Sequence, residues 1–254
     1  MQLDYGNWIR RKNLLFLGVC TIAMGALIFI PLGPTYRVIA TTLFAILLIS
    51  FLFPLYAYFM FSQNGGKLQQ KIYDLIIQHL GEDLQGIIID IGSGNGVLAV
   101  RLAQQHKDIE VMGIDYWGPD WEYSKSVCEK NARTVKVESR VRFQKGDAAL
   151  LDFADNTFDG ATSNLTFHEV KSVSDKKLVV QEALRVVKPG GRFSFVDYFF
   201  DEKYYGKGTE LDRFLKGLNL AHFERQRLQD VMRLPAMLKH PKILGKVGIV
   251  FGKK

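Results

Sequence analysis

The stretch that decides the fold of this chain is Asp90-Ile91-Gly92-Ser93-Gly94-Asn95-Gly96. It follows the apolar run Ile87-Ile88-Ile89, which is typical of a buried strand, and precedes a predicted helix that extends to about His106. Glycines in such a loop permit positive φ angles and let a ligand approach the backbone closely. The start of the following helix offers unpaired N–H groups to a polar or anionic group. The pattern therefore predicts a strand, a ligand-binding loop and a helix.

Strands and helices alternate along the chain on both sides of this loop. Apolar residues at helical spacing predict a helix from Leu68 to Leu80, which ends at Gly81. Downstream we expect strands at 110–114, 141–145, 160–163 and 192–196, and helices at 123–135 and 175–187. Strands separated by helices indicate βαβ units and a mostly parallel sheet that binds ligands at the carboxyl ends of its strands. The expected fold class is α/β, a doubly wound Rossmann-like sheet.

Acidic residues at the ends of the predicted strands narrow the class of ligand. Asp115 ends the second strand, 25 residues after Asp90, where a carboxylate can accept hydrogen bonds from both ribose hydroxyls. Asp147 ends the third strand, although it could also cap the next helix. A nicotinamide-type loop would need glycine or alanine in place of Val97, which argues against a dehydrogenase.

Further motifs follow in order between Ile87 and Tyr198. They are Gly146-Asp147-Ala148, Ser163-Asn164-Leu165-Thr166-Phe167-His168-Glu169-Val170 and Glu182-Ala183-Leu184-Arg185-Val186-Val187-Lys188-Pro189-Gly190-Gly191-Arg192-Phe193. Together with the glycine loop they resemble the class I S-adenosylmethionine-dependent methyltransferases, in particular the ubiquinone/menaquinone-biosynthesis-like (type 11) branch. The resemblance covers less than half of the chain. It implies a class I methyltransferase fold, S-adenosylmethionine as the cofactor and methyl transfer as the reaction.

The resemblance also implies cofactor-binding roles for individual residues. The methionine part of the cofactor would lie on the glycine loop, and Asp115 would bind the ribose. Tyr116 or Trp117 would flank the adenine. The adenine amino group would donate to Asp147, and the backbone N–H of Ala148 would donate to the adenine. Asn164 would lie under the sulfonium. The full set is Asp90, Gly92, Ser93, Gly94, Gly96, Asp115, Tyr116, Trp117, Asp147, Ala148 and Asn164.

Methyl transfer places few chemical demands on the protein beyond alignment of the acceptor and exclusion of water. An oxygen, nitrogen or thiol acceptor can also need a base that removes its proton. His168 is the candidate base, because an imidazole titrates near neutrality, with Glu169 beside it and Tyr198 as a weaker candidate. His168 could instead begin the helix after the strand and face solvent or pack on a lid. Residues 164–167 read Asn-Leu-Thr-Phe rather than Asn-Pro-Pro-Tyr, which argues against glutamine or adenine as the acceptor.

The first 66 residues differ sharply in composition from the rest of the chain. Residues 14–61 hold a single formal charge, Arg37, although the whole chain has 33 Lys and Arg and 26 Asp and Glu. We expect two membrane spans, at about 14–32 and 38–61, joined by a turn at residues 33–37. A cleaved signal peptide and a hairpin buried in a soluble core are the alternatives. The expected domains are therefore a membrane hairpin over 1–66 and a methyltransferase domain over 67–254.

Basic residues set the expected orientation of these spans. Arg10, Arg11 and Lys12 precede the first span and Lys67 and Lys71 follow the second, which predicts a multi-pass protein of the cell membrane with its large domain in the cytoplasm. Cys20 and Cys128 would then lie in different compartments. We expect no disulfide between them, and no spacing of Cys and His indicates a metal site.

The C-terminal part offers weaker signals. Of the strands that should close the sheet, only 247–251 is predicted, and apolar residues at helical spacing occur around Leu211–Leu218 and Leu228–Leu238. From Arg225 onward eight Lys and Arg accompany one acid, Asp230. This stretch is interpreted either as a basic amphipathic element at a membrane surface or as helices packed on the sheet with a solvated basic face.

The membrane anchor suggests the kind of acceptor. A lipophilic acceptor, such as a lipid amine, a quinone precursor, a phenol or a thiol, would explain why the enzyme is tethered. The net charge of +4 from Lys67 onward is too small to favour nucleic acid. The alternatives are a cofactor-binding membrane protein with lost or regulatory activity, and a methyltransferase for a soluble or protein substrate.

Overall fold

The computed structural model describes residues 2–31, 33–119 and 121–254. It divides into two compact units, one of residues Tyr5–Lys71 and one of Ile72–Lys254 together with the N-terminal residues up to Asp4. The expected boundary after residue 66 differs from this division by five residues, because α3 (Leu68–Leu80) begins in the first unit and ends in the second.

The larger unit is built on a seven-stranded sheet in the order β3-β2-β1-β4-β5-β7-β6. The strands are β1 (Gly86–Ile91), β2 (Ile109–Asp115), β3 (Val141–Lys145), β4 (Phe158–Asn164), β5 (Val187–Asp197), β6 (His222–Arg227) and β7 (Gly248–Lys253). The first five strands pair in parallel, and β7 runs antiparallel to both β5 and β6. The expected α/β class and mostly parallel sheet are confirmed.

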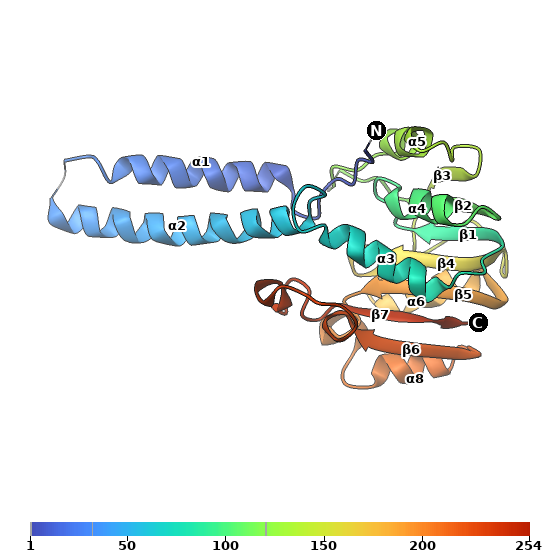
Figure 1. The fold of residues 1–254 in the computed structure, drawn as a ribbon. Helices are drawn as coiled ribbons and strands as arrows, with labels where there is room; N and C mark the ends of the chain where they lie inside the picture. The colour runs from blue at the N-terminus through green and yellow to red at the C-terminus, as the bar shows by residue number, and fades with distance from the viewer. Residues whose placement is uncertain (1, 32, 120) are drawn as a thin grey trace. The chain divides into compact units, whose positions relative to one another are not determined.

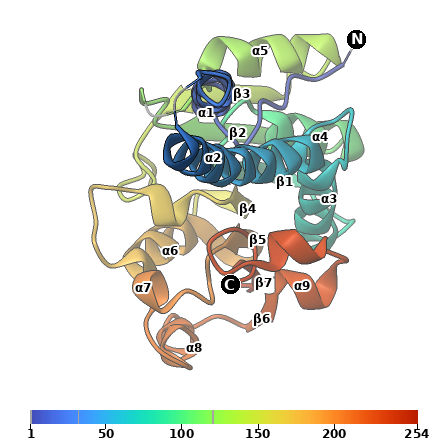
Figure 2. The ribbon, with the colours of Figure 1, turned by 90° about the vertical axis from the view of Figure 1, so that its left-hand side faces the viewer.

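Helices cover both faces of this sheet. The longer ones are α3, α4 (Val97–Gln105), α5 (Lys125–Thr134), α6 (Lys176–Arg185) and α8 (Glu210–Lys216); the short ones are η1 (Phe167–Glu169), α7 (Glu202–Tyr205), α9 (Leu228–Val231) and η2 (Ala236–Lys239). Figure 2 shows α3 and α4 on one side of the sheet and α6 and α7 on the other. Asp175 caps α6 by accepting a hydrogen bond from the Lys177 N–H at 3.0 Å, as its position before the helix suggested.

The main core lies between the sheet and α6. Val180 and Leu184 of α6 pack in the same buried cluster as Phe193 and Phe195 of β5, with at most 3% of each side chain exposed. Burial of such apolar side chains is worth roughly 1.5–3 kcal/mol each. This packing fixes the carboxyl ends of β4 and β5, where the candidate site lies.

The structure differs from the sequence prediction in a helix end, in the stretch 228–238 and in a strand that was not predicted. The helix expected to run to Val187 ends at Arg185, because Val187 already pairs with Phe158 as the first residue of β5. The apolar set at 228–238 forms only the short turns α9 and η2, since Pro235 interrupts the helix. β6 was missed altogether, because an edge strand of half-exposed polar residues lacks the apolar signal of a buried strand.

The smaller unit is a pair of helices, α1 (Arg11–Leu27) and α2 (Pro34–Phe61), which Figure 1 shows side by side. Small residues of α1 face aromatic rings of α2: a Cβ on Gly18 would lie 3.2 Å from the Phe51 ring, and one on Gly25 would lie 3.0 Å from the Phe44 ring. Close approach through small residues is how helices pack where no water is available. Thr21, on the same face, donates its hydroxyl to the Leu17 carbonyl at 2.7 Å.

The predicted spans differ from these helices. α1 ends at Leu27, and Leu32, the expected end of the first span, lies outside the described residues. α2 begins at Pro34 instead of Val38, since proline is well suited to the first turn of a helix. Within the described chain, α2 is the one helix that is long and apolar enough to cross a membrane, on length and composition alone. The core helix of a soluble protein or a signal sequence can meet the same criterion.

Candidate active site

The glycine loop lies at the carboxyl end of β1, between β2 and β4. Gly92, with φ of 79°, is fixed by close packing, because a Cβ there would lie 1.9 Å from the Thr166 hydroxyl oxygen. Gly94, with φ of 57°, is different, since a Cβ there would meet only the ring of Tyr123, at 3.6 Å or more. A Cβ at Gly94 would make an ordinary van der Waals contact with that ring, so glycine suits this position through its positive φ angle and not through close packing.

Asp115 connects the end of β2 to this loop. One oxygen of its carboxylate accepts from the Gly94 N–H at 2.8 Å, and the other accepts from the Trp117 N–H at 2.7 Å. The indole of Trp117 donates to the Gly94 carbonyl at 2.9 Å. Burial raises the pKa of Asp115, although these N–H groups oppose the shift. Asp115 thus lies against the glycine loop, and its role as the ribose ligand stays a prediction.

Asp90 is the most unusual ionisable group of the loop. Its side chain is 1% exposed, and burial raises its pKa to about 6. One carboxylate oxygen accepts from the Thr162 hydroxyl at 3.0 Å, and the other has no hydrogen-bond partner within the described residues. Since Asp115 is close enough to raise the pKa of Asp90 further, the loop contains a buried and a part-buried carboxylate with mutually unfavourable charges. Such a site favours a cationic ligand.

The other expected cofactor residues occupy different surroundings. Asn164 ends β4, and its buried side-chain oxygen has no partner among the described residues, so it is available to a ligand. Asp147 accepts from the Ala149 N–H at 2.9 Å, and Ala148 is buried. Tyr116 is 62% exposed and its ring lies under the Lys145 ammonium, so Trp117 is the aromatic residue that contacts the loop. The hydroxyl of Ser93 donates to the Asp90 carbonyl and stiffens the turn.

The three candidate catalytic residues lie together at the ends of β4 and β5. The Nδ1 atom of His168 lies 2.8 Å from an oxygen of Asp197, and its Nε2 atom lies 3.4 Å from Glu169. The ring of Tyr198 packs edge-on against the imidazole with 4.6 Å between ring centres, and the ring of Tyr204 lies at 5.6 Å. His168 therefore belongs to a buried polar cluster, which excludes the alternative of a solvent-facing side chain.

Asp197 controls the protonation of His168. Burial by itself would lower the pKa of His168, but the charge and hydrogen bond of the fully buried Asp197 outweigh it and raise the pKa to about 9. Burial raises the pKa of Tyr198 to about 12, so this phenol stays neutral at physiological pH. At physiological pH the imidazole is therefore protonated, with Nδ1 toward Asp197 and Nε2 toward Glu169. It can act as an oriented general base only after it loses the Nε2 proton.

Sequence reasoning missed Asp197, Thr162 and Thr166. Asp197 is a strand-end carboxylate next to Tyr198, which is a signal of the kind that identified Asp115. Its pairing with His168, 29 residues away, follows from the parallel pairing of β4 with β5. Thr162 and Thr166 carry no comparable signal, because threonine is common in strands and turns.

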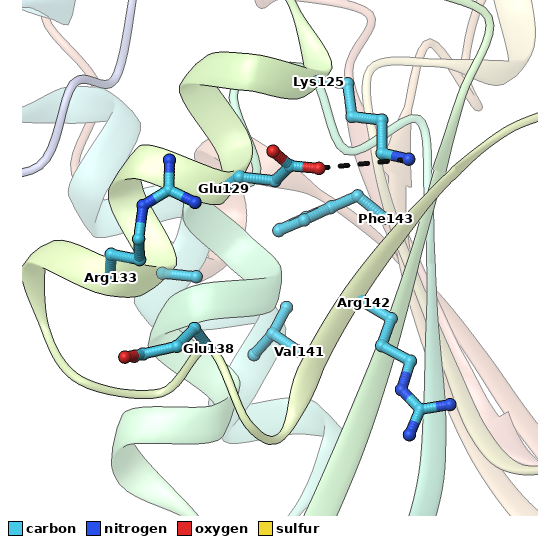
Figure 3. A pocket seen from close by; sticks show the side chains of 8 residues that line it. Lys125, Glu129, Arg133, Glu138, Val141, Arg142 and Phe143 are labelled. Carbon is cyan, nitrogen blue, oxygen red and sulfur yellow. Dashed lines mark ion pairs between the residues drawn. The ribbon is translucent and has the colours of Figure 1, made fainter.

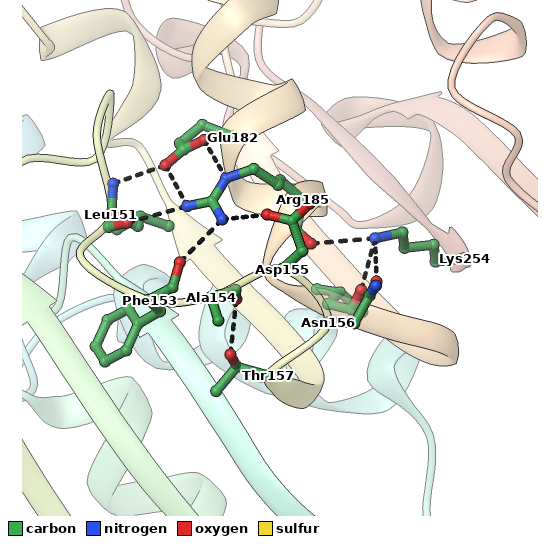
Figure 4. Close-up of polar contacts among 10 residues, drawn as sticks. Leu151, Phe153, Ala154, Asp155, Asn156, Thr157, Glu182, Arg185 and Lys254 are labelled. Carbon is green, nitrogen blue, oxygen red and sulfur yellow. Dashed lines mark hydrogen bonds and ion pairs between the residues drawn. The ribbon is translucent and has the colours of Figure 1, made fainter.

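A network around Arg185 holds the loop that follows Asp147, as Figure 4 shows. The guanidinium forms a two-pronged contact with Glu182, a 2.6 Å ion pair with Asp155, and hydrogen bonds to the carbonyls of Leu151 and Phe153. All five N–H donors of the guanidinium are thereby used. The motif that carries Glu182 and Arg185 is thus structural in this chain, since it fastens the adenine-side loop to α6.

A hollow of about 310 Å³ lies between α5 and β3, as Figure 3 shows. Its lining mixes charges of both signs: Lys125, Glu129, Ala132, Arg133, Glu138, Val141, Arg142 and Phe143. None of these residues belongs to the expected cofactor set. The hollow is therefore not the candidate active site.

The fold and site define an S-adenosylmethionine-dependent methyltransferase domain. This assignment rests on the strand order, on the glycine loop at the end of β1 and on the carboxylate at the end of β2. Residues 83–234 match the family model described as a methyltransferase domain, which is more than half of the chain. The chain therefore belongs to the methyltransferase domain family. The buried carboxylate of Asp90, the part-buried carboxylate of Asp115 and the unpartnered oxygens of Asp90 and Asn164 fit this cationic cofactor.

Individual relatives share part of this chain. An O-methyltransferase of Aspergillus nomiae is 30% identical over 130 residues, which are 50% of this chain and 54% of that protein, so the chain spans about half its length. The ubiquinone/menaquinone biosynthesis C-methyltransferase UbiE of Desulfotalea psychrophila is 26% identical over 208 residues, 73% of this chain and 80% of that protein.

Solved structures show the same fold. The geranyl diphosphate C-methyltransferase of Streptomyces coelicolor, in complex with Mg²⁺, geranyl diphosphate and S-adenosyl-L-homocysteine, aligns with a TM-score of 0.54 at 15% identity, over 74% of this chain and 80% of that chain. At this identity the similarity concerns the fold.

Proposed function

We propose that this protein is a membrane-anchored methyltransferase whose domain lies on the cytoplasmic side and methylates a lipophilic small molecule. The acceptor would be a phenol, a quinone precursor, a lipid amine or a thiol, with a hydroxyl-bearing compound favoured. S-adenosylmethionine supplies an activated methyl group when bound. The residues of this chain would bind the cofactor, orient the acceptor and remove its proton.

The observation that carries the membrane part of the proposal is the outer surface of α1 and α2. Large apolar side chains point outward from both helices: Phe16 is 69% exposed and Ile22 is 75% exposed in α1, and Ile49 is 70% exposed in α2. Monomeric soluble proteins rarely expose apolar surface so continuously, whereas a bilayer covers it. The two helices pack on each other through a narrow stripe of small residues, and they leave the rest of their apolar surface uncovered.

Both helices would insert, although they differ in length. α2 has 28 residues and is about 42 Å long, more than the hydrocarbon thickness of a bilayer. α1 has 17 residues and is about 25 Å long, and the apolar residues Ile28, Phe29 and Ile30 extend it beyond the helix. Arg10, Arg11 and Lys12 before α1, and Lys67 and Lys71 after α2, support a cytoplasmic location for both ends.

The anchor favours an acceptor that partitions into the membrane. Six residues separate α2 from α3, and a chain of this length reaches at most about 25 Å. The domain would stay close to the bilayer at all times. A compound concentrated in the bilayer would thereby meet the enzyme at high local concentration, whereas a freely soluble acceptor would gain nothing from the tether.

The His168–Asp197 pair favours an acceptor that must lose a proton. Asp197 would hold the imidazole with Nε2 toward the acceptor, and the rings of Tyr198 and Tyr204 beside it would pack against an aromatic or isoprenoid group. A positioned base of this kind typically contributes 10²–10⁴-fold to the rate. His168 would first lose its own Nε2 proton, which its pKa of about 9 makes easier at alkaline pH, and Nε2 would turn from Glu169 to the acceptor. The proton of the acceptor would then pass to the neutral Nε2 as the methyl group is transferred.

Isolated membranes that contain the full-length protein test the proposal. They are incubated with S-adenosylmethionine labelled in its methyl group and then extracted with organic solvent. We expect label in the organic phase with the native protein and none with Asp115→Ala, which serves as the matched control. Label found only in water-soluble compounds or in protein would refute the lipophilic acceptor. Binding of the cofactor without any labelled product would favour a non-catalytic role.

A further inference from the structure

We infer that residues 232–246, the part of the connection between β6 and β7 that follows α9, are a second membrane-contacting surface that binds anionic lipid head groups beside the active site. We call it the basic connection. The inference deepens the proposed function and rests on its membrane anchor. Its occupant would be the surface of a bilayer that contains acidic phospholipids.

The basic connection is an ordered, folded surface. Leu234, Leu238 and Leu244 are at most 4% exposed and fasten it to the domain. Backbone hydrogen bonds close it on itself, including those from Leu244 to the Leu238 carbonyl at 3.1 Å and from Gly245 to the His240 carbonyl at 3.1 Å. Its outward side chains are therefore presented at fixed positions.

Those outward side chains are basic and apolar. Arg233, Lys239 and Lys242 are exposed, and none of the three has an ion-pair partner within the described residues. Met237 lies among them with 52% of its surface exposed. Residues 232–246 contain no acidic residue. Cationic side chains around an exposed apolar one are the combination that binds an anionic membrane interface.

The position of the basic connection joins it to the active site. Gly248, the first residue of β7, pairs with Asp197, and the Phe200 N–H donates to the Lys246 carbonyl at 3.0 Å. The connection therefore lies at the carboxyl edge of β5, the edge that carries His168 and Tyr198. Figure 1 shows it extending from the ends of β6 and β7 that are opposite the C-terminus.

α3 joins the two units of the chain, since its first residues belong to the smaller unit and the others to the larger one. A domain that is tethered to a bilayer, and that also binds the bilayer through the basic connection, would bring its active site toward the source of a lipophilic acceptor.

Fluorescence quenching in the full-length protein tests this inference. Proteins are labelled with bimane at a single cysteine and reconstituted in nanodiscs of brominated phosphatidylcholine, with or without about 30% phosphatidylglycerol. One protein carries the label at Met237→Cys, and the control carries it at Lys107→Cys on the amino edge of the sheet. Both have Cys20→Ala so that the label cannot react there, and Cys128 is fully buried. We expect quenching at position 237 with phosphatidylglycerol, weaker quenching without it, and none at position 107.

Charge removal provides the second readout. The second variant combines Arg233→Gln, Lys239→Gln and Lys242→Gln. It should lower the ratio of docked to undocked domain roughly 100-fold, because each cation near an anionic surface raises this ratio about fivefold. The control Lys107→Gln, Arg133→Gln and Arg142→Gln removes the same charge from exposed positions near the amino edge and should leave quenching at position 237 unchanged.

The possible outcomes separate this inference from the proposed function. Equal quenching at positions 237 and 107, or no effect of the charge removal in the basic connection, would overturn the inference. A label on the native Cys20 reports insertion of α1 independently. If Cys20 is quenched and position 237 is not, the anchor stands and the second contact is wrong. If Cys20 is not quenched, the membrane anchor itself is wrong and this inference fails with it.

Discussion

Replacement of Asp90 by Asn should change how the stability of the domain depends on pH. In the native protein, burial raises the pKa of Asp90 from 3.8 to about 6. Since the folded state holds this proton more tightly than the unfolded state, the free energy of unfolding is highest below pH 3.8. It falls as the pH rises, and levels off above about 6. Asn cannot ionise, so this dependence should disappear in the variant.

The magnitude follows from the size of the shift. The rise in the pKa from 3.8 to about 6 means that full ionisation of Asp90 lowers the free energy of unfolding by about 3 kcal/mol. Because Asp90 is only 1% exposed, solvent screening reduces this value little. Between about pH 4.5 and 7.5 the free energy of unfolding of Asp90→Asn, relative to the native protein, should rise by about 2 kcal/mol. An unpaired amide N–H in the variant adds a constant cost and leaves this difference intact.

Urea unfolding in mild detergent, followed by the fluorescence of Trp117 and Trp121, measures this difference. An equal effect of the substitution at both pH values would refute the assignment of a raised pKa to Asp90. The cofactor gives an independent readout. If the ionised carboxylate faces its ammonium group, native affinity should rise about tenfold between pH 5 and 7, because the ionised fraction rises by that factor. The variant should bind more weakly, with no such dependence.

Three further predictions concern the cofactor, the base and the loop anchor. Asp115→Ala should weaken cofactor binding about 10–100-fold in calorimetry with the circular dichroism spectrum unchanged, since a buried charged acceptor is lost; unaltered affinity would exclude the ribose role. His168→Gln should lower kcat about 10²–10⁴-fold and leave cofactor affinity intact. The native rate should rise with pH up to about 9, where His168 loses its proton, and a flat pH profile would argue against the base. Arg185→Met should lower the free energy of unfolding in urea by about 2–3 kcal/mol, because it removes the contact with Glu182. Asp155→Asn should lower it by less than about 1 kcal/mol, because the Asp155 side chain is 69% exposed. Equal losses in the two variants would show that the contact between Arg185 and Glu182 is unimportant for stability.

The parallel part of the fold was predictable because its strands are short apolar runs with informative ends. β3 has the predicted bounds, and β1, β2 and β4 each extend the predicted strand by one to three residues. β6 was not predictable, because its half-exposed residues pair only with β7 and need no apolar pattern. The apolar spacing after Leu228 predicted a helix, but spacing alone does not show that Pro235 interrupts it.

The candidate site was predictable where one residue carries the chemistry by itself. Asp115 is the last residue of β2 and His168 lies in η1 just after β4, and the structure places both at the carboxyl edge of the sheet. The role of Asp197 depends on the pairing of β4 with β5, and the unpartnered oxygen of Asp90 depends on burial, so neither is encoded locally. The two helices α1 and α2 were expected from composition, whereas their bounds depend on Pro34 and on the packing of small residues.

Mass spectrometry of cells with and without the gene tests the central claim, that this domain methylates a lipophilic acceptor at the membrane. Cells that carry the native gene should contain an organic-soluble compound heavier by one methylene than its counterpart in cells without it. Cells that carry Asp115→Ala should lack the heavier compound, and those that carry His168→Gln should accumulate it slowly. A methylene difference confined to water-soluble compounds, or a heavier lipophilic compound that persists with Asp115→Ala, would contradict the account.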